Sequence, residues 1–109
     1  MEVHLKIKVL SVNECWQGKR FKTPAYKAYE KELLYRLPKI LAMPLPPYRI
    51  TFEFGMSNIQ SDYDNPVKPL QDILQKKYGF NDAHIFEAII RKVKVNKGNE
   101  YFNVKIETI

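Results

Sequence analysis

The sequence predicts a small α+β fold, in which one mixed β-sheet carries helices mainly on one face. Three segments alternate apolar and polar residues at the period of a β-strand, and two others carry apolar residues at helical spacing between helix start and stop signals. The predicted order is strand, helix, strand, helix, strand, strand. With 109 residues and no internal repeat, residues 1–109 are expected to form a single domain.

The first predicted strand is followed by a basic loop. Apolar residues alternate with polar ones from residue 3 to residue 9, which predicts a half-buried strand whose outer face carries His4 and lysines. Residues 11–23 break this periodicity and are expected to be a loop. Basic and aromatic residues are interleaved there, at Trp16, Lys19, Arg20, Phe21 and Lys22. This mixture suits contact with phosphates and unstacked bases, whereas the simpler interpretation is a solvated loop with its tryptophan docked on the core.

The first predicted helix runs from Pro24 to about Leu37. Thr23 is its expected cap, Pro24 suits the first helical position, and Pro38 ends the helix. A proline-rich connector follows, and residues 50–56 then alternate as a second strand.

An acidic stretch, residues 61–72, joins the second strand to the second predicted helix. Asn65 is expected to cap that helix, Pro66 to occupy its first position, and Gly79 to end it. Three charged residues spaced four apart share one helical face: Asp64, Lys68 and Asp72. Apolar residues at core spacing occupy a different face: Val67, Leu70, Leu74 and Tyr78. The charged face is therefore expected to point away from the core.

The last part of the chain is predicted to hold two strands. Asp82 is expected to cap a short turn before a strand over residues 85–95. This strand has apolar residues on both faces, which is typical of a central strand covered on both sides. Residues 97–99 form an expected hairpin turn into a last strand over residues 101–107.

The composition narrows the classes of protein to which the chain can belong. The formal net charge of +6 and the isoelectric point near 9.4 favour a polyanionic partner such as nucleic acid, although many small proteins are equally basic. Cys15 is the single cysteine, so neither an internal disulfide nor a cysteine zinc site is expected. The charged, alternating start is unlike a signal peptide, and no apolar run approaches the ~20 residues of a membrane span. The expected location is therefore the cytoplasm, with no membrane partner.

The carboxylates around the second helix suit a hard divalent cation. Asp62, Asp64 and Asp82 supply the oxygen ligands that Mg²⁺ prefers, and such a cation activates water and neutralises the leaving oxygen in phosphodiester cleavage. Lys68 among these carboxylates would stay protonated and stabilise charge on a phosphate. Asp72 can pair with Lys68 in a supporting role. In isolation, the same spacing is also typical of a turn with helix capping.

Three motifs follow one another between residues 62 and 94, and Ser11-Val12-Asn13 precedes them after the first predicted strand. They are Asp62-x-Asp64-Asn65-x-x-Lys68-x-x-x-Asp72, then Gly79-Phe80-Asn81-Asp82, then the basic run Ile90-Arg91-Lys92-Val93-Lys94. In this order they resemble the RusA family of Holliday-junction endonucleases. The chain departs from that family in two places. Asn81 stands where relatives often have a second aspartate, and the basic loop carries fewer glycines.

The resemblance implies a homodimeric, Mg²⁺-dependent nuclease, with Mn²⁺ as a substitute, that resolves four-way DNA junctions by paired symmetric nicks in recombination and repair. By motif position it implies Asp62, Asp64 and Asp82 as catalytic metal ligands, Lys68 as the catalytic lysine, and Asp72 as a supporting residue together with the helix-capping Asn65. We expect the DNA-facing surface to include Lys19, Arg20, Lys22, Arg91, Lys92 and Lys94. The host would be a bacterial cell or a phage-infected one.

Two other functions fit the same residues. A non-catalytic DNA-binding protein would use the aspartates as helix caps and lysine partners, and its behaviour would depend on neither Mg²⁺ nor Asp64. A metal-dependent phosphohydrolase would hydrolyse small phosphate esters and show no preference for branched DNA. The separated carboxylates around Lys68, together with the basic flanks, favour the junction-resolving nuclease over both.

Overall fold

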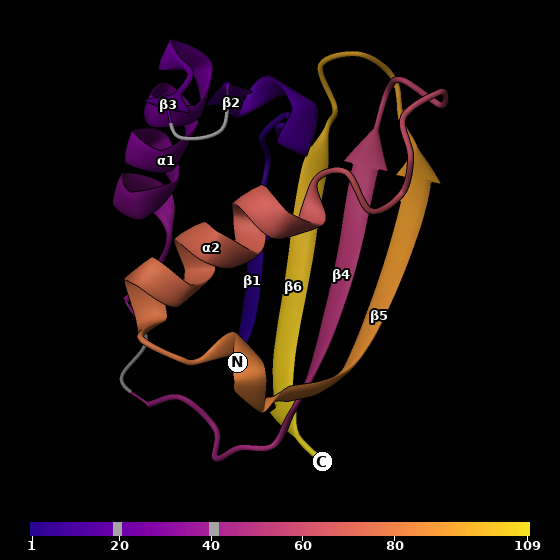
Figure 1. Ribbon diagram of the computed structural model, residues 1–109. Coiled ribbons are helices and arrows are strands. Elements are labelled where there is room, and N and C mark those ends of the chain that lie inside the picture. Colours follow the sequence, from indigo (N-terminus) through magenta and orange to yellow (C-terminus); the bar gives the residue numbers. More distant parts are fainter. Residues whose placement is uncertain (19–20, 40–41) are drawn as a thin grey trace.

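A mixed four-stranded β-sheet forms the centre of the protein, and two α-helices lie on one face of it (Figure 1). The computed structural model describes residues 1–18, 21–39 and 42–109. Within them the sheet has the strand order β1-β6-β4-β5, and a separate ribbon pairs β2 with β3. In chain order the elements are β1 (Glu2–Leu5), η1 (Val12–Glu14), β2 (Trp16–Gln17), β3 (Phe21–Lys22), α1 (Pro24–Arg36), β4 (Tyr48–Met56), α2 (Val67–Tyr78), η2 (Asp82–His84), β5 (Ile85–Lys94) and β6 (Tyr101–Thr108). The predicted α+β fold is confirmed.

The core lies between the sheet and the helices. Alternate residues of the two central strands are buried, as the two-residue period of a strand requires: Ile50, Phe52, Phe54, Phe102, Val104 and Ile106. The helices bury their own apolar stripes in the same cluster, namely Tyr26, Tyr29, Leu33, Leu70, Ile73 and Leu74. The other face of the sheet carries mostly polar and charged side chains, such as Arg49, Glu53 and Glu87. No helix in the described part of the chain is long and apolar enough to cross a membrane.

Both α-helices follow their predicted boundaries closely. The backbone N–H of Tyr26 donates to the Thr23 side-chain oxygen at 3.1 Å, so Thr23 caps α1 as predicted. That helix ends at Arg36, close to the predicted Leu37. Gly79 follows α2 with a φ of 75°, a left-handed conformation that glycine adopts without a steric penalty.

The first strand is shorter than predicted. It spans Glu2–Leu5 and pairs antiparallel with β6, where Leu5 lies opposite Phe102. Because β6 begins at Tyr101, there is almost no strand left beside which β1 could continue. Val9 is nevertheless buried. The alternation of apolar residues therefore continues past the end of the strand because these residues still pack on the core.

Residues 11–23 hold more regular structure than the expected loop. Ser11 and Glu14 form a reciprocal capping box around η1, and the short strands β2 and β3 pair as a ribbon. Cys15 is buried, and burial raises the pKa of its thiol to about 11. The predicted DNA-binding residues Lys19 and Arg20 lie outside the described residues.

The prediction that the third long strand is central was wrong. β5 pairs with β4 alone among the described strands, so it forms an edge of the sheet, and most of its side chains are exposed. The apolar residues on both of its faces suggested burial, but the two helices lie over the opposite half of the sheet (Figure 1). Position in the sheet therefore overrides the local sequence pattern.

The predicted hairpin between the last two strands was also wrong. A turn does form at residues 96–99, where the N–H of Asn99 donates to the carbonyl of Asn96 at 2.9 Å. However, β4 lies between β5 and β6, parallel to the former and antiparallel to the latter. The segment β4-α2-β5 is thus a parallel crossover unit, in which a helix carries the chain back to the same end of the sheet.

Candidate active site

The acidic stretch enters α2 through turns rather than through a side-chain cap. The N–H of Asn65 donates to the carbonyl of Asp62 at 3.3 Å, and the N–H of Val67 donates to that of Asp64 at 3.0 Å. The helix begins at Val67 with Pro66 at the cap position and no side-chain cap hydrogen bond, so the prediction of Asn65 as the cap was wrong. Proline has no N–H and a fixed φ, which suits this turn as well as the predicted first helical position. Asn65 instead accepts a hydrogen bond at its carbonyl from the N–H of Val12 at 2.9 Å.

A cluster of one lysine and two aspartates lies on the outer side of α2. Lys68 Nζ is 2.8 Å from Asp72 Oδ1, which is one helical turn further on, and 3.9 Å from Asp82 Oδ2. We call these three residues the Lys68 cluster. The side chains are 60% exposed for Lys68, 36% for Asp72 and 46% for Asp82, so a ligand can reach all three from solvent.

The electrostatics of the Lys68 cluster keep its lysine charged. The close Asp72 carboxylate, helped by Asp82 and only partly opposed by desolvation, raises the pKa of Lys68 above its ordinary value of 10.5. A group with a raised pKa of this kind is fully protonated at neutral pH. The prediction that Lys68 stays a cation among carboxylates is therefore supported by the geometry.

Asp82 reaches the cluster from a short helical turn that another residue caps. Asn81 accepts the N–H of Ala83 at its side-chain oxygen at 2.9 Å, so Asn81 caps η2 and the prediction of Asp82 as the cap was wrong. The Asp82 carboxylate is thereby left to face Lys68. Asn81, at which the sequence differs from the RusA motif, is therefore the residue that caps η2.

Asp62 and Asp64 lie exposed in the turns before α2. Residues 1–18, 21–39 and 42–109 contain no group of three or more His, Cys, Asp or Glu side chains arranged to hold a metal ion. Asp62, Asp64 and Asp82 are thus not gathered into one ligand set, and Asp82 has Lys68 as its partner. The donor chemistry itself fits Mg²⁺ or Mn²⁺, because all three are accessible carboxylates.

Two predicted DNA-binding lysines hold the loop that leads into the acidic stretch. Lys92 Nζ donates to the carbonyls of Ile59 and Ser61, at 3.0 and 2.6 Å. Lys94 Nζ donates to the carbonyl of Ser57 at 2.8 Å. Both residues are exposed, so their contacts are compatible with a basic surface near the site.

The other described members of the predicted DNA surface have carboxylate partners. Lys22 Nζ lies 3.1 Å from Glu30 Oε2 and 5.3 Å from the centre of the Tyr26 ring. Arg91 Nε lies 3.8 Å from Glu53 Oε1, on the helix-free face of the sheet. Arg91 and Lys92 therefore point to opposite faces of β5, as neighbours in a strand must.

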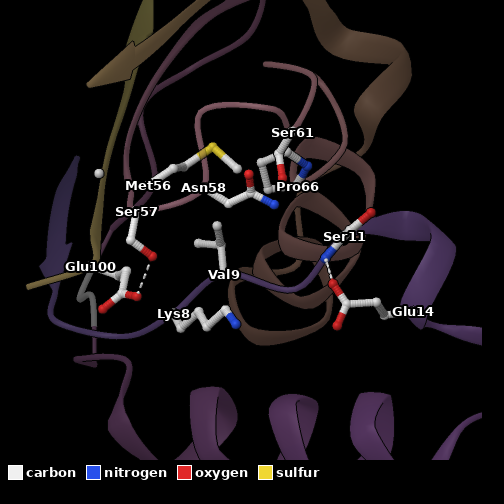
Figure 2. Close-up of a pocket in the computed structure, with 11 residues that line it drawn as sticks. Lys8, Val9, Ser11, Glu14, Met56, Ser57, Asn58, Ser61, Pro66 and Glu100 are labelled. Atoms are coloured by element: carbon white, nitrogen blue, oxygen red, sulfur yellow. Dashed lines mark hydrogen bonds between the residues drawn. The ribbon is translucent and has the colours of Figure 1, made fainter. Parts of the chain in front are cut away.

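A small pocket that the sequence reasoning did not find lies beside the acidic stretch (Figure 2). Its volume is about 100 Å³, and Ser61 and Pro66 form part of its wall. Ser57 donates to Glu100 at 2.8 Å on the opposite side. Typical small-molecule sites are about 300–1,000 Å³, so this pocket is too small to enclose an organic phosphate ester. No local motif marks it, because its lining comes from four separate segments.

Comparisons with known proteins leave the family of this chain open. No family model matches the sequence. No curated protein matches it either.

Proposed function

We propose that this protein is a metal-dependent endonuclease that cuts branched DNA, with the Lys68 cluster at its active centre. The observation that carries the proposal is the convergence of Lys68, Asp72 and Asp82 on one exposed surface. These are residues that the acidic motif and the following Asp82 motif single out. Cleavage of a phosphodiester needs positive charge where the phosphate develops negative charge, and Lys68 supplies it.

Lys68 would act by donating to a phosphate oxygen. Its raised pKa keeps it protonated, and Asp72 at 2.8 Å holds the ammonium group in place along the helix. The contact with Asp82 is longer, at 3.9 Å, and is the one that an entering ligand would exchange. Asp72 is thus a positioning residue in this proposal.

To hold one Mg²⁺, or Mn²⁺ in its place, the turns before α2 would have to bring Asp62 and Asp64 toward Asp82. The bound cation would supply the activation of water and the neutralisation of the leaving oxygen. The protein supplies three exposed carboxylates, from the turns before and after α2. Lys92 and Lys94 anchor the loop that precedes Asp62, through the carbonyls of Ser61 and Ser57.

The DNA surface of this proposal combines the basic loop and the edge strand. It comprises Lys19, Arg20, Lys22, Lys92 and Lys94, whereas Arg91 points to the opposite face of β5, beside Glu53. The net charge of +6 supports binding to a polyanion. A four-way junction is nearly two-fold symmetric, so paired cuts need two copies of a chain with one acidic cluster. The substrate would be junctions formed in recombination and repair, in the cytoplasm of a bacterial or phage-infected cell.

A second candidate is a DNA-binding protein without catalysis. One observation favours it: Lys68 already has Asp72 and Asp82 as ion-pair partners, as this alternative predicts. Exposed pairs of this kind typically contribute about 0–1 kcal/mol, so they are common without function.

The deciding experiment compares a synthetic four-way junction with a linear duplex of the same sequence. Wild type, Asp64→Asn and the control Glu32→Gln are each incubated with and without Mg²⁺. We expect paired nicks on the junction alone, lost without Mg²⁺ and in Asp64→Asn, but kept in the control. Junction binding without cleavage in any divalent cation would instead establish the DNA-binding alternative. Turnover of a generic phosphate ester without cleavage of the junction would point to a phosphohydrolase.

A further inference from the structure

The edge strand β5 is unusually open for a strand rich in apolar residues. It runs for ten residues, and among the described strands β4 is its one neighbour. Phe86 is 72% exposed and Ile89 is 45% exposed. Figure 1 shows β5 at the side of the sheet that the helices do not cover. Long apolar edges invite pairing with another strand, so proteins usually cover or charge them.

Two rows of side chains cross the helix-free face of the sheet and end at β5. In the first row Glu107, Arg49 and Glu87 lie side by side on β6, β4 and β5. Arg49 Nε lies 3.1 Å from Glu87 and its Nη1 lies 3.4 Å from Glu107. The sign of the charge therefore alternates across this row and reaches the edge as a carboxylate.

The second row ends at the edge with the opposite charge. Asn103, Glu53 and Arg91 lie side by side on the same three strands. Asn103 donates to Glu53 at 3.0 Å, and Arg91 lies 3.8 Å from Glu53. The open edge thus presents Glu87 and Arg91, four residues apart, with the apolar Ile89 midway between them.

We propose that two copies of this chain join edge to edge through antiparallel β5 strands, with a two-fold axis at Ile89. In this register Glu87 lies opposite Arg91 of the partner subunit, and Arg91 lies opposite Glu87 of the partner subunit. The first charge row then continues into the partner's second row, and the sign of the charge alternates from Glu107 to Glu53 of the partner subunit. Ile89 meets its own copy at the centre of the interface.

The charges select this register among the possible ones. Residues directly opposite each other in an antiparallel pair lie on the same face of the sheet. The two-fold axis must therefore lie between two copies of the same β5 residue. An axis at Ala88 would place Glu87 opposite Ile89, and an axis at Ile90 would place it opposite Val93. With the axis at Ile89, both edge charges meet opposite charges. On the other face the same register sets Ala88 against Ile90, a small residue against a large one.

The biological purpose of this dimer rests on the proposed function, in which paired cuts need two copies of the chain. The evidence for the dimer itself involves no nuclease chemistry. The test needs neither DNA nor a metal ion. A failure of the pairing and a failure of the nuclease proposal are therefore distinguishable.

The experiment measures the mass of the full chain in solution by sedimentation over micromolar concentrations. Wild type is expected at twice the 12.9 kDa chain mass. Glu87→Arg sets like charges opposite each other at both ends of the interface, and so does Arg91→Glu. Each variant alone is expected to dimerise at least about tenfold more weakly, because like charges repel across an interface. An equimolar mixture restores both opposite pairs and should recover the dimer.

A third variant tests the centre of the interface. Ile89→Lys brings two lysines together at the axis and should give a monomer, whereas Leu45→Lys changes an exposed apolar residue elsewhere and should leave the dimer intact. Circular dichroism confirms that each variant is folded. A monomeric wild type at all concentrations would overturn the proposal and leave the edge open to a strand of another protein. A dimer that survives both charge variants, or a mixture that fails to recover it, would also overturn it.

Discussion

Lys68 lies within the acidic stretch and Lys92 and Lys94 lie on β5, and the two sets use their charge in different ways. Lys68 faces two carboxylates, from Asp72 and Asp82. Lys92 and Lys94 donate to main-chain carbonyls of the preceding loop. A carboxylate cancels the charge of a lysine, whereas a carbonyl oxygen leaves that charge uncompensated and fixes its position.

The difference distinguishes a lysine that can take part in the reaction from lysines that hold the loop in place. A compensated lysine can exchange one anionic partner for another, such as a phosphate, with little change in net charge. A lysine bound to carbonyls fixes a loop and at the same time adds to the positive field around the site. We therefore expect substitutions at the two sets to change different measurements.

The sharpest test of this comparison is Lys68→Ala. Under the proposed function, removal of the donor aimed at the phosphate should lower the rate of junction cleavage by about 100-fold or more. Junction affinity should change little, because the charge of Lys68 is already balanced. Cleavage rates and binding curves for the variant check both statements, with Lys31→Ala on the exposed side of α1 as the control. A parallel loss of affinity would make Lys68 a docking residue instead.

A third set of basic residues, Lys19 and Arg20, extends the comparison to DNA affinity. The double substitution Lys19→Ala with Arg20→Ala should weaken junction binding by about tenfold at moderate salt. Each lost phosphate contact also reduces the slope of log affinity against log salt by about 0.9. Binding measured over a salt series checks this slope. If the slope equals that of wild type, the loop does not contact DNA.

Removal of the loop lysines should act on stability more than on chemistry. Lys92→Ala with Lys94→Ala removes the donors to Ser57, Ile59 and Ser61, at a cost of about 1 kcal/mol in the free energy of unfolding. Proteolysis in the loop should also become faster, since its backbone loses these anchors. Urea unfolding and limited proteolysis measure the two effects. Lys97→Ala, an exposed lysine in the turn after β5, should show neither effect.

The smallest expected effect concerns two lysines that share one carboxylate. Lys22 and Lys76 lie 3.1 and 3.2 Å from Glu30, and despite its partial burial they hold the pKa of Glu30 below its ordinary value of 4.5. The lowered pKa means that this stabilisation is present above pH 4.5 and is lost as the pH falls through the folded-state pKa. Glu30→Gln should therefore cost about 0.5 kcal/mol at neutral pH and progressively less in acid. Unfolding curves over a pH series check this trend, and a constant difference would contradict it.

The two helices, the start of α1 and the end of α2 were predictable because their signals are local. Thr23 caps α1, Gly79 ends α2, and the i,i+4 spacing of Lys68 and Asp72 brings them together on any regular helix. The capping of the turns was less predictable. Asn65, Asn81 and Asp82 are all good capping residues, and only Asn81 takes that role. Residues with similar local preference are distinguished by the path of the backbone around them.

The sequence alone specified the α+β class, both helices, the buried face of α2 and one half of the Lys68 cluster, because each depends on residues a few positions apart. The tertiary structure decided the rest. It placed β4 between β5 and β6 and left β5 at the edge of the sheet. It also brought Asp82 to Lys68, fourteen positions away in the chain, and placed Lys92 and Lys94 against the loop. These features depend on which strand lies beside which, and strand order is determined by the packing of the whole core rather than by any local pattern.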